Sequence, residues 1–371
     1  MPASFDVIIV GGGAIGAACA REIGRGGRHV ALIEPGDDRG QAWRAAAGML
    51  APQIEADGSD PLLALGIAAR DHYDGLVPAL EESTGIAVGL WREGIARVAT
   101  EAEDAVALQA KVAWQREHGL RTGWLEPADL RRRWPWLGPA LGALWAPDDG
   151  ALDPGQLVRA LLADAQRSDV VVVADRANSV RRRGEKVTGV TGERDSYSAP
   201  DVVIAAGAWS PLIEGLPRTL PVQPVRGQMA ALPWPSNVAR AIVYHRDAYL
   251  LVRGSEAILG STMEYVGFDP QVTRDGVARI FSSTMALCPG LVRAKVRRTW
   301  AGLRPVTPDG LPVIGADPAL QGLWYATGHG RNGILLAGLT GLLVAQLLRG
   351  DRPAHDLRRF APDRFDANAS A

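Results

Sequence analysis

An apolar run followed by three closely spaced glycines opens the chain, and this feature limits its fold more than any other. Residues Val7–Val10 lead directly into the pattern Gly11-x-Gly13-x-x-Gly16. Gly11 permits a tight turn, Gly13 lets the backbone approach a pyrophosphate, and Gly16 lets a helix pack closely on the strand. Because the free N–H groups at the start of such a helix attract an anion, the pattern predicts a phosphate-binding turn.

A second apolar run ends on an acid where this motif needs one. Residues His29–Ile33 are followed by Glu34, about 20 residues beyond the glycines, where a carboxylate can accept hydrogen bonds from a ribose diol. Strand, turn, helix, strand and acid together predict a βαβ unit that binds a dinucleotide. A glycine-rich turn without a ligand is the alternative, and it is less favoured because both strands and the acid are in place.

The size and charge of the chain narrow its class. With 371 residues it exceeds the length at which one hydrophobic core usually stops growing, so two domains are expected. A net charge of −1 gives no basic field, which argues against nucleic acid as a partner. Cys19 and Cys288 are isolated and the six histidines are scattered, so neither a disulfide nor a metal site is predicted.

No segment of the sequence is typical of a membrane or targeting signal. The longest apolar stretch, Ile334–Leu348, is shorter than the roughly 20 residues that span a bilayer. The residues before the first strand lack the apolar region of a signal peptide. We therefore expect no membrane span and a cytoplasmic location, while the sequence leaves open whether the chain forms a homo-oligomer.

The segments that follow alternate between two kinds of sheet pattern. Short apolar runs near the beginning, middle and end suit a parallel sheet, whereas residues 241–263 form a run of strands without helices, which suits an antiparallel sheet. We expect an α/β plus α+β fold, with an antiparallel substrate-binding domain threaded through a discontinuous Rossmann-like nucleotide-binding domain. The nucleotide-binding domain is expected to comprise residues 1–85, 146–220 and 300–371, and the substrate-binding domain residues 86–145 and 221–299.

Several segments carry a specific structural expectation. The apolar spacing of Pro61–Thr84 predicts a long helix. Residues 86–98 look strand-like, Val170–Val173 is typical of a buried strand, and another strand is expected near Val296. Pro217–Pro235 contains several prolines and is expected to cross between the two domains.

Two later segments indicate which dinucleotide is bound. The run Val202–Gly207 is expected to bring small residues to the nucleotide crevice. Gly328–Gly333 precedes an apolar helix and so offers a second set of N–H groups at a helix N-terminus. One such site suits a pyrophosphate, and a second suits a flavin ring, whose reduced form carries negative charge. An ordinary tight turn remains the alternative for this second glycine cluster.

These segments together carry a family resemblance. The glycine motif, Glu34, Ala45–Met49, Ala205–Trp209, Trp300–Gly310 and Gly328–Leu335 resemble the FAD-dependent D-amino-acid oxidase family, and within it the glycine oxidases of thiamine biosynthesis. The resemblance covers nearly the whole chain, and its last two motifs are the specific ones. It implies a noncovalently bound FAD, held by the Rossmann-like domain.

The resemblance also implies roles for residues around the substrate. Arg304 would pair with the substrate carboxylate, and Tyr249 would donate a hydrogen bond to the same group. Met263 and Met49 would line the apolar side of the pocket, and Arg331 would lie near both flavin and substrate. An arginine suits this task because its two parallel charge-assisted hydrogen bonds fix both the position and the orientation of a carboxylate.

The flavin contacts implied by the resemblance come from both ends of the chain. They are Gly11, Gly13, Ala14, Ile15, Gly16, Glu34, Pro35, Ala42, Trp43, Ala47, Gly48, Met49, Ala177, Gly207, His329, Gly330, Arg331, Asn332, Gly333, Ile334 and Leu335.

Two residues depart from the family pattern. Asp247 stands where a histidine can occur, so its carboxylate is expected to face solvent or an arginine. Gly330 replaces a bulkier residue and is expected to widen the entrance for larger or N-substituted substrates.

The implied reaction is a two-electron oxidation of an amine next to a carboxylate. A small amino acid such as glycine, sarcosine or a small D-amino acid would yield an oxo acid, ammonia and hydrogen peroxide, with dioxygen as the final acceptor. Two alternatives stay open: a D-amino-acid dehydrogenase that passes electrons to a quinone or carrier, and a catalytically silent flavin-binding subunit. An NAD-only dehydrogenase is less favoured because the second glycine cluster would then lack a purpose. Covalent flavin attachment is also disfavoured, since Gly302 stands where a cysteine would be needed.

Overall fold

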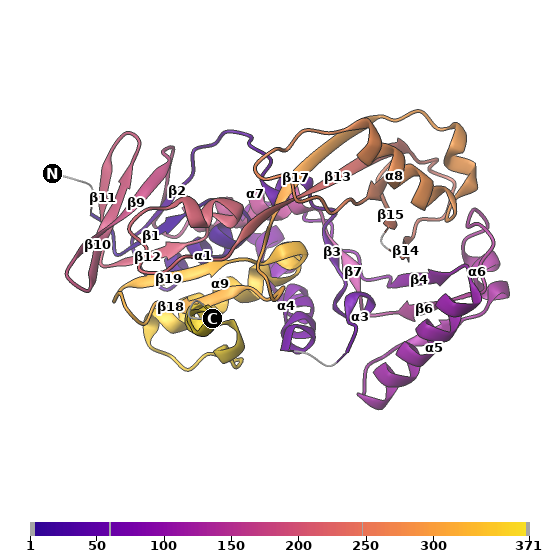
Figure 1. Ribbon diagram of the computed structural model, residues 1–371, viewed down its shortest axis with the longest axis horizontal. Coiled ribbons are helices and arrows are strands. Elements are labelled where there is room, and N and C mark those ends of the chain that lie inside the picture. Colours follow the sequence, from indigo (N-terminus) through magenta and orange to yellow (C-terminus); the bar gives the residue numbers. More distant parts are fainter. Residues whose placement is uncertain (1–3, 59–60, 247, 369–371) are drawn as a thin grey trace.

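The computed structural model describes residues 4–58, 61–246 and 248–368 and arranges most of their strands in two large sheets (Figure 1). Each sheet combines strands from distant parts of the sequence. One sheet is mostly parallel and flanked by helices, and the other is mostly antiparallel. This arrangement confirms the predicted fold class.

The six-stranded sheet is built around the first strand of the chain. Its order is β18 (Val313–Ala316), β19 (Leu323–Thr327), β12 (Asp201–Ile204), β1 (Val7–Val10), β2 (Val30–Ile33) and β8 (Val170–Val173). All neighbours are parallel except the pair β18 and β19. Every residue of β1 and β2 is buried, because helices and a small sheet cover both faces. Continuous apolar runs are what such a doubly covered sheet requires.

Strand β8 is partly exposed, whereas the sequence predicts a buried strand. Val171 is 43% exposed and Val172 37% exposed. The reason is its place at the edge of the sheet, where it pairs with β2 alone. Its apolar composition therefore reflects strand propensity more than burial.

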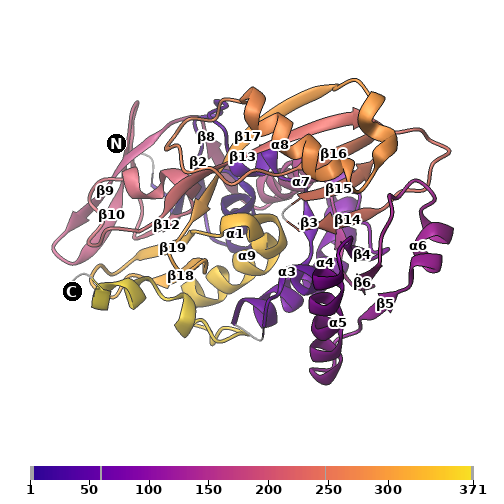
Figure 2. The same cartoon turned by 45° about the vertical axis from the view of Figure 1, so that its right-hand side comes forward.

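A layer of helices packs on the six-stranded sheet. It includes α1 (Ala14–Arg25), α7 (Pro154–Gln166) and α9 (Gly333–Arg349), and α4 (Pro61–Thr84) packs in turn on α7 and α9. Helix α4 has the predicted bounds. Helices α1 and α9 lie side by side (Figure 2), and a Cβ at Gly341 would stand 2.6 Å from the Ala18 backbone carbonyl carbon. This close approach explains why residue 341 of α9 is a glycine.

Helix α9 is longer than the apolar stretch seen in the sequence. Among the described helices, Gly330–Arg349 alone is long and apolar enough to cross a membrane by length and composition. However, 61% of that segment is buried inside the protein, where it packs mainly on α1 and α4 and also contacts β18 and β3. A core helix meets the same criterion, so the segment is weak evidence for a span.

The eight-stranded sheet contains the predicted antiparallel run. Its order is β17 (Arg298–Val306), β13 (Gln223–Pro233), β16 (Glu256–Gly260), β15 (Ala248–Arg253), β14 (Ile242–His245), β4 (Ile95–Ala99), β6 (Gly142–Ala146) and β5 (Gly123–Leu125). Only β14 and β4 run parallel to each other. Helix α8 (Arg274–Met285) packs on β13, β15 and β16, while α5 (Ala102–Glu117) and α6 (Pro127–Arg133) pack on β6.

One segment prediction needs correction, and the structure refines two others. Within 86–98, only the end belongs to a named strand, β4. The strand expected near Val296 begins at Arg298. The segment Pro217–Pro235 contains the 11-residue strand β13. Strand β13 pairs with β16 only from Met229 to Pro233, so around Pro224 it has a neighbouring strand on one side only. Pro224 is tolerated there because no backbone N–H is needed for a hydrogen bond on the other side.

The predicted boundary at residue 300 falls inside a strand. Strand β17 pairs with β13 along its whole length, so it runs in the eight-stranded sheet. The division of the chain into two domains itself stays a prediction.

Smaller elements complete the structure. They are the sheet β9 (Ala177–Arg183), β10 (Lys186–Gly192) and β11 (Ser196–Ser198); the pair β3 (Met49–Leu50) and β7 (Gly150–Ala151); the short helices α2 (Ala42–Ala45) and α3 (Pro52–Glu55); and the 3₁₀ turns η1 (Gly207–Leu212), η2 (Pro289–Arg293), η3 (Gly330–Asn332), η4 (Arg358–Phe360) and η5 (Pro362–Asn368).

Candidate active site

A cavity of about 570 Å³ is lined by residues of both large sheets and reaches from the glycine motif to Arg304. It brings together most of the predicted site residues, although they come from opposite ends of the chain. The predicted residues that line it are Gly11, Gly13, Ala14, Ile15, Glu34, Pro35, Ala42, Trp43, Ala47, Gly48, Met49, Ala177, Gly207, Tyr249, Arg304, His329, Gly330, Arg331, Asn332, Gly333 and Ile334. Their roles as ligand contacts stay predictions.

Three predicted residues do not line this cavity. Gly16 lies beneath the turn, where a Cβ would stand only 1.8 Å from the Gly11 carbonyl oxygen, so it allows the close packing expected of it. Leu335 is buried in the hydrophobic core. The Met263 side chain is 53% exposed and lies outside the cavity lining, although its sulfur is 3.5 Å from Arg304 Nη1. Asp247 lies outside the described residues.

The phosphate-binding turn has the geometry that its sequence predicts. Gly11 adopts a φ of +104°, which only glycine reaches without strain. Helix α1 begins after Gly13 with no side-chain cap on its free N–H groups, which leaves them available to an anion. The Glu34 carboxylate accepts a hydrogen bond from the Gly12 N–H at 2.7 Å. Turn and acid therefore fit the pyrophosphate and ribose of a dinucleotide.

The second glycine cluster contributes to the same cavity. Residues His329–Ile334 line it as the chain passes through η3 into α9. The His329 ring bonds the Thr340 hydroxyl through Nε2 at 3.1 Å, while its Nδ1 is buried without a hydrogen-bond partner. Burial lowers the pKa of His329 to about 3, so the ring is neutral. An unpaired buried nitrogen beside a cavity is consistent with a site that a ligand completes.

Arg304 points its guanidinium into the cavity from β17. It donates hydrogen bonds to the Thr262 carbonyl oxygen at 3.0 Å and to the Ser261 hydroxyl at 2.8 Å. Among residues 4–58, 61–246 and 248–368, no carboxylate forms an ion pair with it. Burial lowers the pKa of Arg304, but an arginine keeps its charge in proteins. The site therefore holds a positive charge whose remaining N–H donors can bind an anion.

Tyr249 lies beside this guanidinium. Its hydroxyl contacts the Met229 sulfur at 3.2 Å, and burial raises the pKa of Tyr249 to about 12. The phenol is therefore protonated and able to donate a hydrogen bond. Its ring packs on Tyr244 at a centroid separation of 5.5 Å.

The predicted residue Arg331 has an acidic partner that the sequence did not reveal. Arg331 Nη2 lies 3.0 Å from Glu55 Oε1, and the Tyr244 hydroxyl donates to the same oxygen at 2.8 Å. Glu55 lines the cavity and raises the pKa of Arg331 further above its usual range. The only local signal for Glu55 is its position shortly after the Ala45–Met49 motif, in a segment without a motif of its own.

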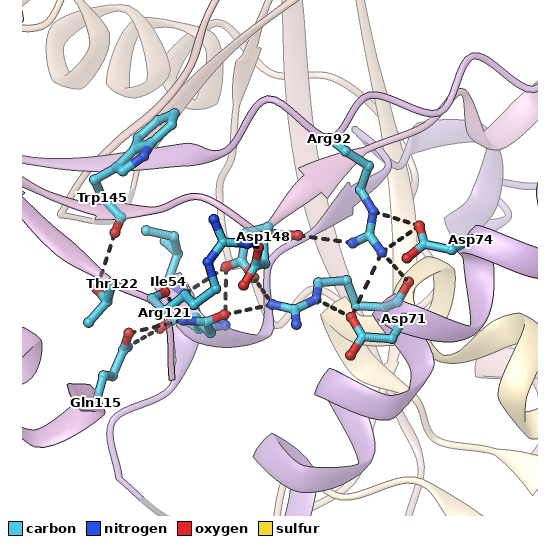
Figure 3. A network of polar contacts seen from close by, with 12 residues as sticks. Ile54, Asp71, Asp74, Arg92, Gln115, Arg121, Thr122, Trp145 and Asp148 are labelled. Atoms are coloured by element: carbon cyan, nitrogen blue, oxygen red, sulfur yellow. Dashed lines mark hydrogen bonds and ion pairs between the residues drawn. The ribbon is translucent and has the colours of Figure 1, made fainter. Parts of the chain in front are cut away.

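A buried polar network fixes the helix that carries Glu55. Asp149 accepts hydrogen bonds from the backbone N–H groups of Gln53 and Ile54 at 3.1 and 3.0 Å, which caps α3. Arg70 donates to the same carboxylate at 3.0 Å. Figure 3 shows this network extending to Arg92 on one side and Gln115 on the other. The position of Glu55 is therefore set by residues behind the cavity.

Within the described part of the chain, no group of three or more His, Cys, Asp or Glu side chains could hold a metal ion. The sulfurs of Cys19 and Cys288 are buried and unpaired. At the substrate end, the polar side chains of the cavity include the guanidinium groups of Arg304 and Arg331, the Tyr249 phenol and the Glu55 carboxylate.

Comparison with known proteins agrees with this geometry. The family model of FAD-dependent oxidoreductases, DAO, matches residues 6–347. The chain belongs to this family. FAD is therefore its cofactor, and the cavity between the glycine turn and Arg304 fits the extended shape of that molecule.

Several family members resemble the chain over most of its length. The glycine oxidase of Geobacillus kaustophilus is 34% identical over 96% of each chain, and a crystal structure of that protein superposes with a TM-score of 0.93 over 98% of this chain and 99% of that one. The bifunctional protein ThiO/ThiG of Synechocystis is 34% identical over 98% of this chain and 55% of its own length. The iminodiacetate oxidase of Chelativorans is 26% identical, with a TM-score of 0.89 over 96% of this chain and 98% of that one. The chain is an FAD-dependent amino-acid oxidase.

Proposed function

We propose that this enzyme oxidises glycine or another small amino acid, such as sarcosine or a small D-amino acid, to an oxo acid and hydrogen peroxide, with release of ammonia or, from sarcosine, of methylamine. The observation that carries the proposal is the Arg304 guanidinium, which lines the cavity without an acidic partner beside the Tyr249 hydroxyl. A substrate carboxylate would satisfy both groups. The glycine oxidases among its relatives support the same substrate class.

The residues of this chain orient the substrate rather than attack it. Arg304 and Tyr249 would hold the carboxylate, which leaves the amine-bearing carbon exposed to the cofactor. A bound FAD supplies a two-electron acceptor, which dioxygen can reoxidise. The Tyr249 phenol is protonated, and the lowered pKa of His329 makes its ring a weak base, so neither suits general-base catalysis at this carbon. Positioning and electrostatics are then the contribution of the protein.

The cofactor would be held without a covalent bond. Glu34 and the turn at Gly11–Gly13 would hold the ribose and pyrophosphate, and residues 329–334 would contact the flavin. Gly302 lines the cavity, and a Cβ there would stand 2.5 Å from the Ala45 side chain, so the position has no room for a cysteine thioether.

A role in thiamine biosynthesis is part of this proposal. It draws support from the relatives named ThiO/ThiG, of which the chain spans about half the length. We also propose that the enzyme works in the cytoplasm.

The test is a substrate panel scored by flavin reduction without oxygen, followed by peroxide measurement in air. We expect glycine, sarcosine or a small D-amino acid to bleach the flavin, and peroxide to appear in equal amount to the substrate consumed. Bleaching without peroxide would favour the dehydrogenase that passes electrons to a quinone or carrier. A flavin that no small amino acid reduces would contradict the proposal.

A further inference from the structure

The substrate end of the cavity contains two guanidinium groups in different electrostatic states. Arg304 has neutral partners, the Thr262 carbonyl and the Ser261 hydroxyl. Arg331 lines the same cavity but forms an ion pair with Glu55. One positive charge is therefore available to an anion, and the other is already neutralised.

We infer that Glu55 restricts the charge of the substrates that the enzyme accepts. Because Glu55 forms an ion pair with Arg331, the site selects amino acids with a single carboxylate and excludes those with a second carboxylate on the amine substituent. This inference rests on the proposed function, because it assumes that Arg304 binds the first carboxylate. A substrate with one carboxylate needs one free guanidinium. A second carboxylate near Arg331 would meet the Glu55 charge and find the guanidinium already engaged, which is a repulsive element of specificity.

The position of Glu55 makes this ion pair persistent. Its acceptor oxygen also receives the Tyr244 hydroxyl bond at 2.8 Å, and Tyr244 is almost fully buried. The N-terminus of α3 is capped by the buried Asp149 carboxylate. Because the helix and the second hydrogen bond both fix the carboxylate, it cannot move aside readily for an incoming anion.

One solved structure of similar fold has a name that points to a diacid. The iminodiacetate oxidase of similar fold is named for a secondary amine that carries two carboxylates. In the present chain, the pair of arginines that such a diacid would need is present, but one of the two is bound to Glu55. The Glu55 carboxylate is thus the group that discriminates between substrates with one and with two carboxylates.

The test uses two ligands that lack an oxidisable amine. Thiodiacetate has two carboxylates joined through a thioether, and methylthioacetate has one. Their dissociation constants are measured from the perturbation of the visible spectrum of the FAD-loaded enzyme, and the quantity compared is the ratio of monoacid to diacid dissociation constants. Comparing a ratio cancels effects that act equally on both ligands, such as incomplete loading with FAD.

Three variants separate the freed arginine from other effects. Glu55→Gln keeps the size of the side chain but releases Arg331, so we expect the ratio to rise at least tenfold in favour of the diacid. Glu55→Gln combined with Arg331→Met should return the ratio to within about threefold of the parent. Tyr244→Phe is the matched control, because it removes the other hydrogen bond to Glu55 while keeping the ion pair, and its ratio should rise by less than threefold.

Two results would overturn the inference. One is a parent enzyme that already binds thiodiacetate at least tenfold more tightly than methylthioacetate. The other is a Glu55→Gln ratio that does not change, or that rises equally when Arg331 is also replaced. Flavin reduction by sarcosine in the same preparations reports on the proposed function separately, since the binding ratio requires no turnover.

Discussion

Gly227 lies directly against the guanidinium of Arg304. A Cβ at Gly227 would stand 2.2 Å from Arg304 Nη1, inside any normal contact distance. The two residues lie on the paired strands β13 and β17, so the backbone of one strand provides the space that the side chain of the other fills. The orientation of the proposed carboxylate-binding group thus depends on the absence of a side chain on its neighbour.

Replacing Arg304 with alanine should raise the KM for the preferred substrate by about two orders of magnitude. Each hydrogen bond to a charged group is worth about 1.5–3 kcal/mol, and the carboxylate would lose at least one. The purified variant should remain yellow, since the glycine turn and Glu34 are remote from this position. Steady-state kinetics with full FAD loading provide the measurement. A variant that handles the substrate like its parent would refute the carboxylate assignment.

Gly227→Ala should displace the Arg304 guanidinium while leaving the arginine in place. We expect kcat/KM to fall at least tenfold, because a misplaced charged group loses the geometry that orients the substrate. Gly75→Ala is the matched control: Gly75 lies in α4, and a Cβ there meets nothing within 4 Å. Its activity should match the parent. Equal activity in both variants would show that the guanidinium tolerates the methyl group.

The features that could be predicted from sequence are those with local causes. Gly11, Gly13 and Gly16 each serve a backbone requirement within one turn, so their spacing alone indicates the βαβ unit. The long helix α4 follows from apolar spacing within its own segment. The family resemblance added Arg304, Tyr249 and the second glycine cluster to the predicted site.

The features that sequence could not supply depend on distant neighbours. Glu55 meets Tyr244 from β14 and Arg331 from η3, and no local pattern marks a four-residue helix held by a remote Asp149. The exposure of β8 depends on having one neighbouring strand instead of two. The strand β13 was obscured by prolines that are tolerated because part of it pairs on one side only.

Removal of the Glu34 carboxylate should weaken FAD binding. Glu34→Ala loses both the acceptor for the Gly12 N–H, which it bonds at 2.7 Å, and the proposed partner of the ribose. We expect the dissociation constant of FAD for the apoprotein to rise at least tenfold, measured by fluorescence quenching of the free cofactor. Glu34→Gln keeps an acceptor oxygen and should lose less. Unchanged affinity in the alanine variant would exclude a role for this acid in cofactor binding.

Asp149 should give the protein a distinctive dependence of stability on pH. Burial raises the pKa of Asp149 to about 7 in the folded protein, against an ordinary value of 3.8. Between these values the folded state binds more protons than the unfolded state, so this group stabilises the protein fully below about pH 4, and its contribution is lost as the pH rises to about 7. Other titratable groups also make the unfolding free energy depend on pH, so the contribution of Asp149 is isolated by comparison with Asp149→Asn.

The asparagine variant should be less stable by about 1 kcal/mol at low pH, because one of the two oxygens that cap α3 and bind Arg70 becomes an amide NH2 group. Asparagine does not titrate, so the gap in unfolding free energy between parent and variant should narrow as the pH rises from about 4 to about 7. Denaturant unfolding across this range measures the gap. Asp148→Asn, which changes a carboxylate that pairs with the exposed Arg121, should shift stability by less than about 1 kcal/mol. A gap that widens with pH would mean that Asp149 is ionised in the fold, and that its pairing with Arg70 outweighs the cost of its burial.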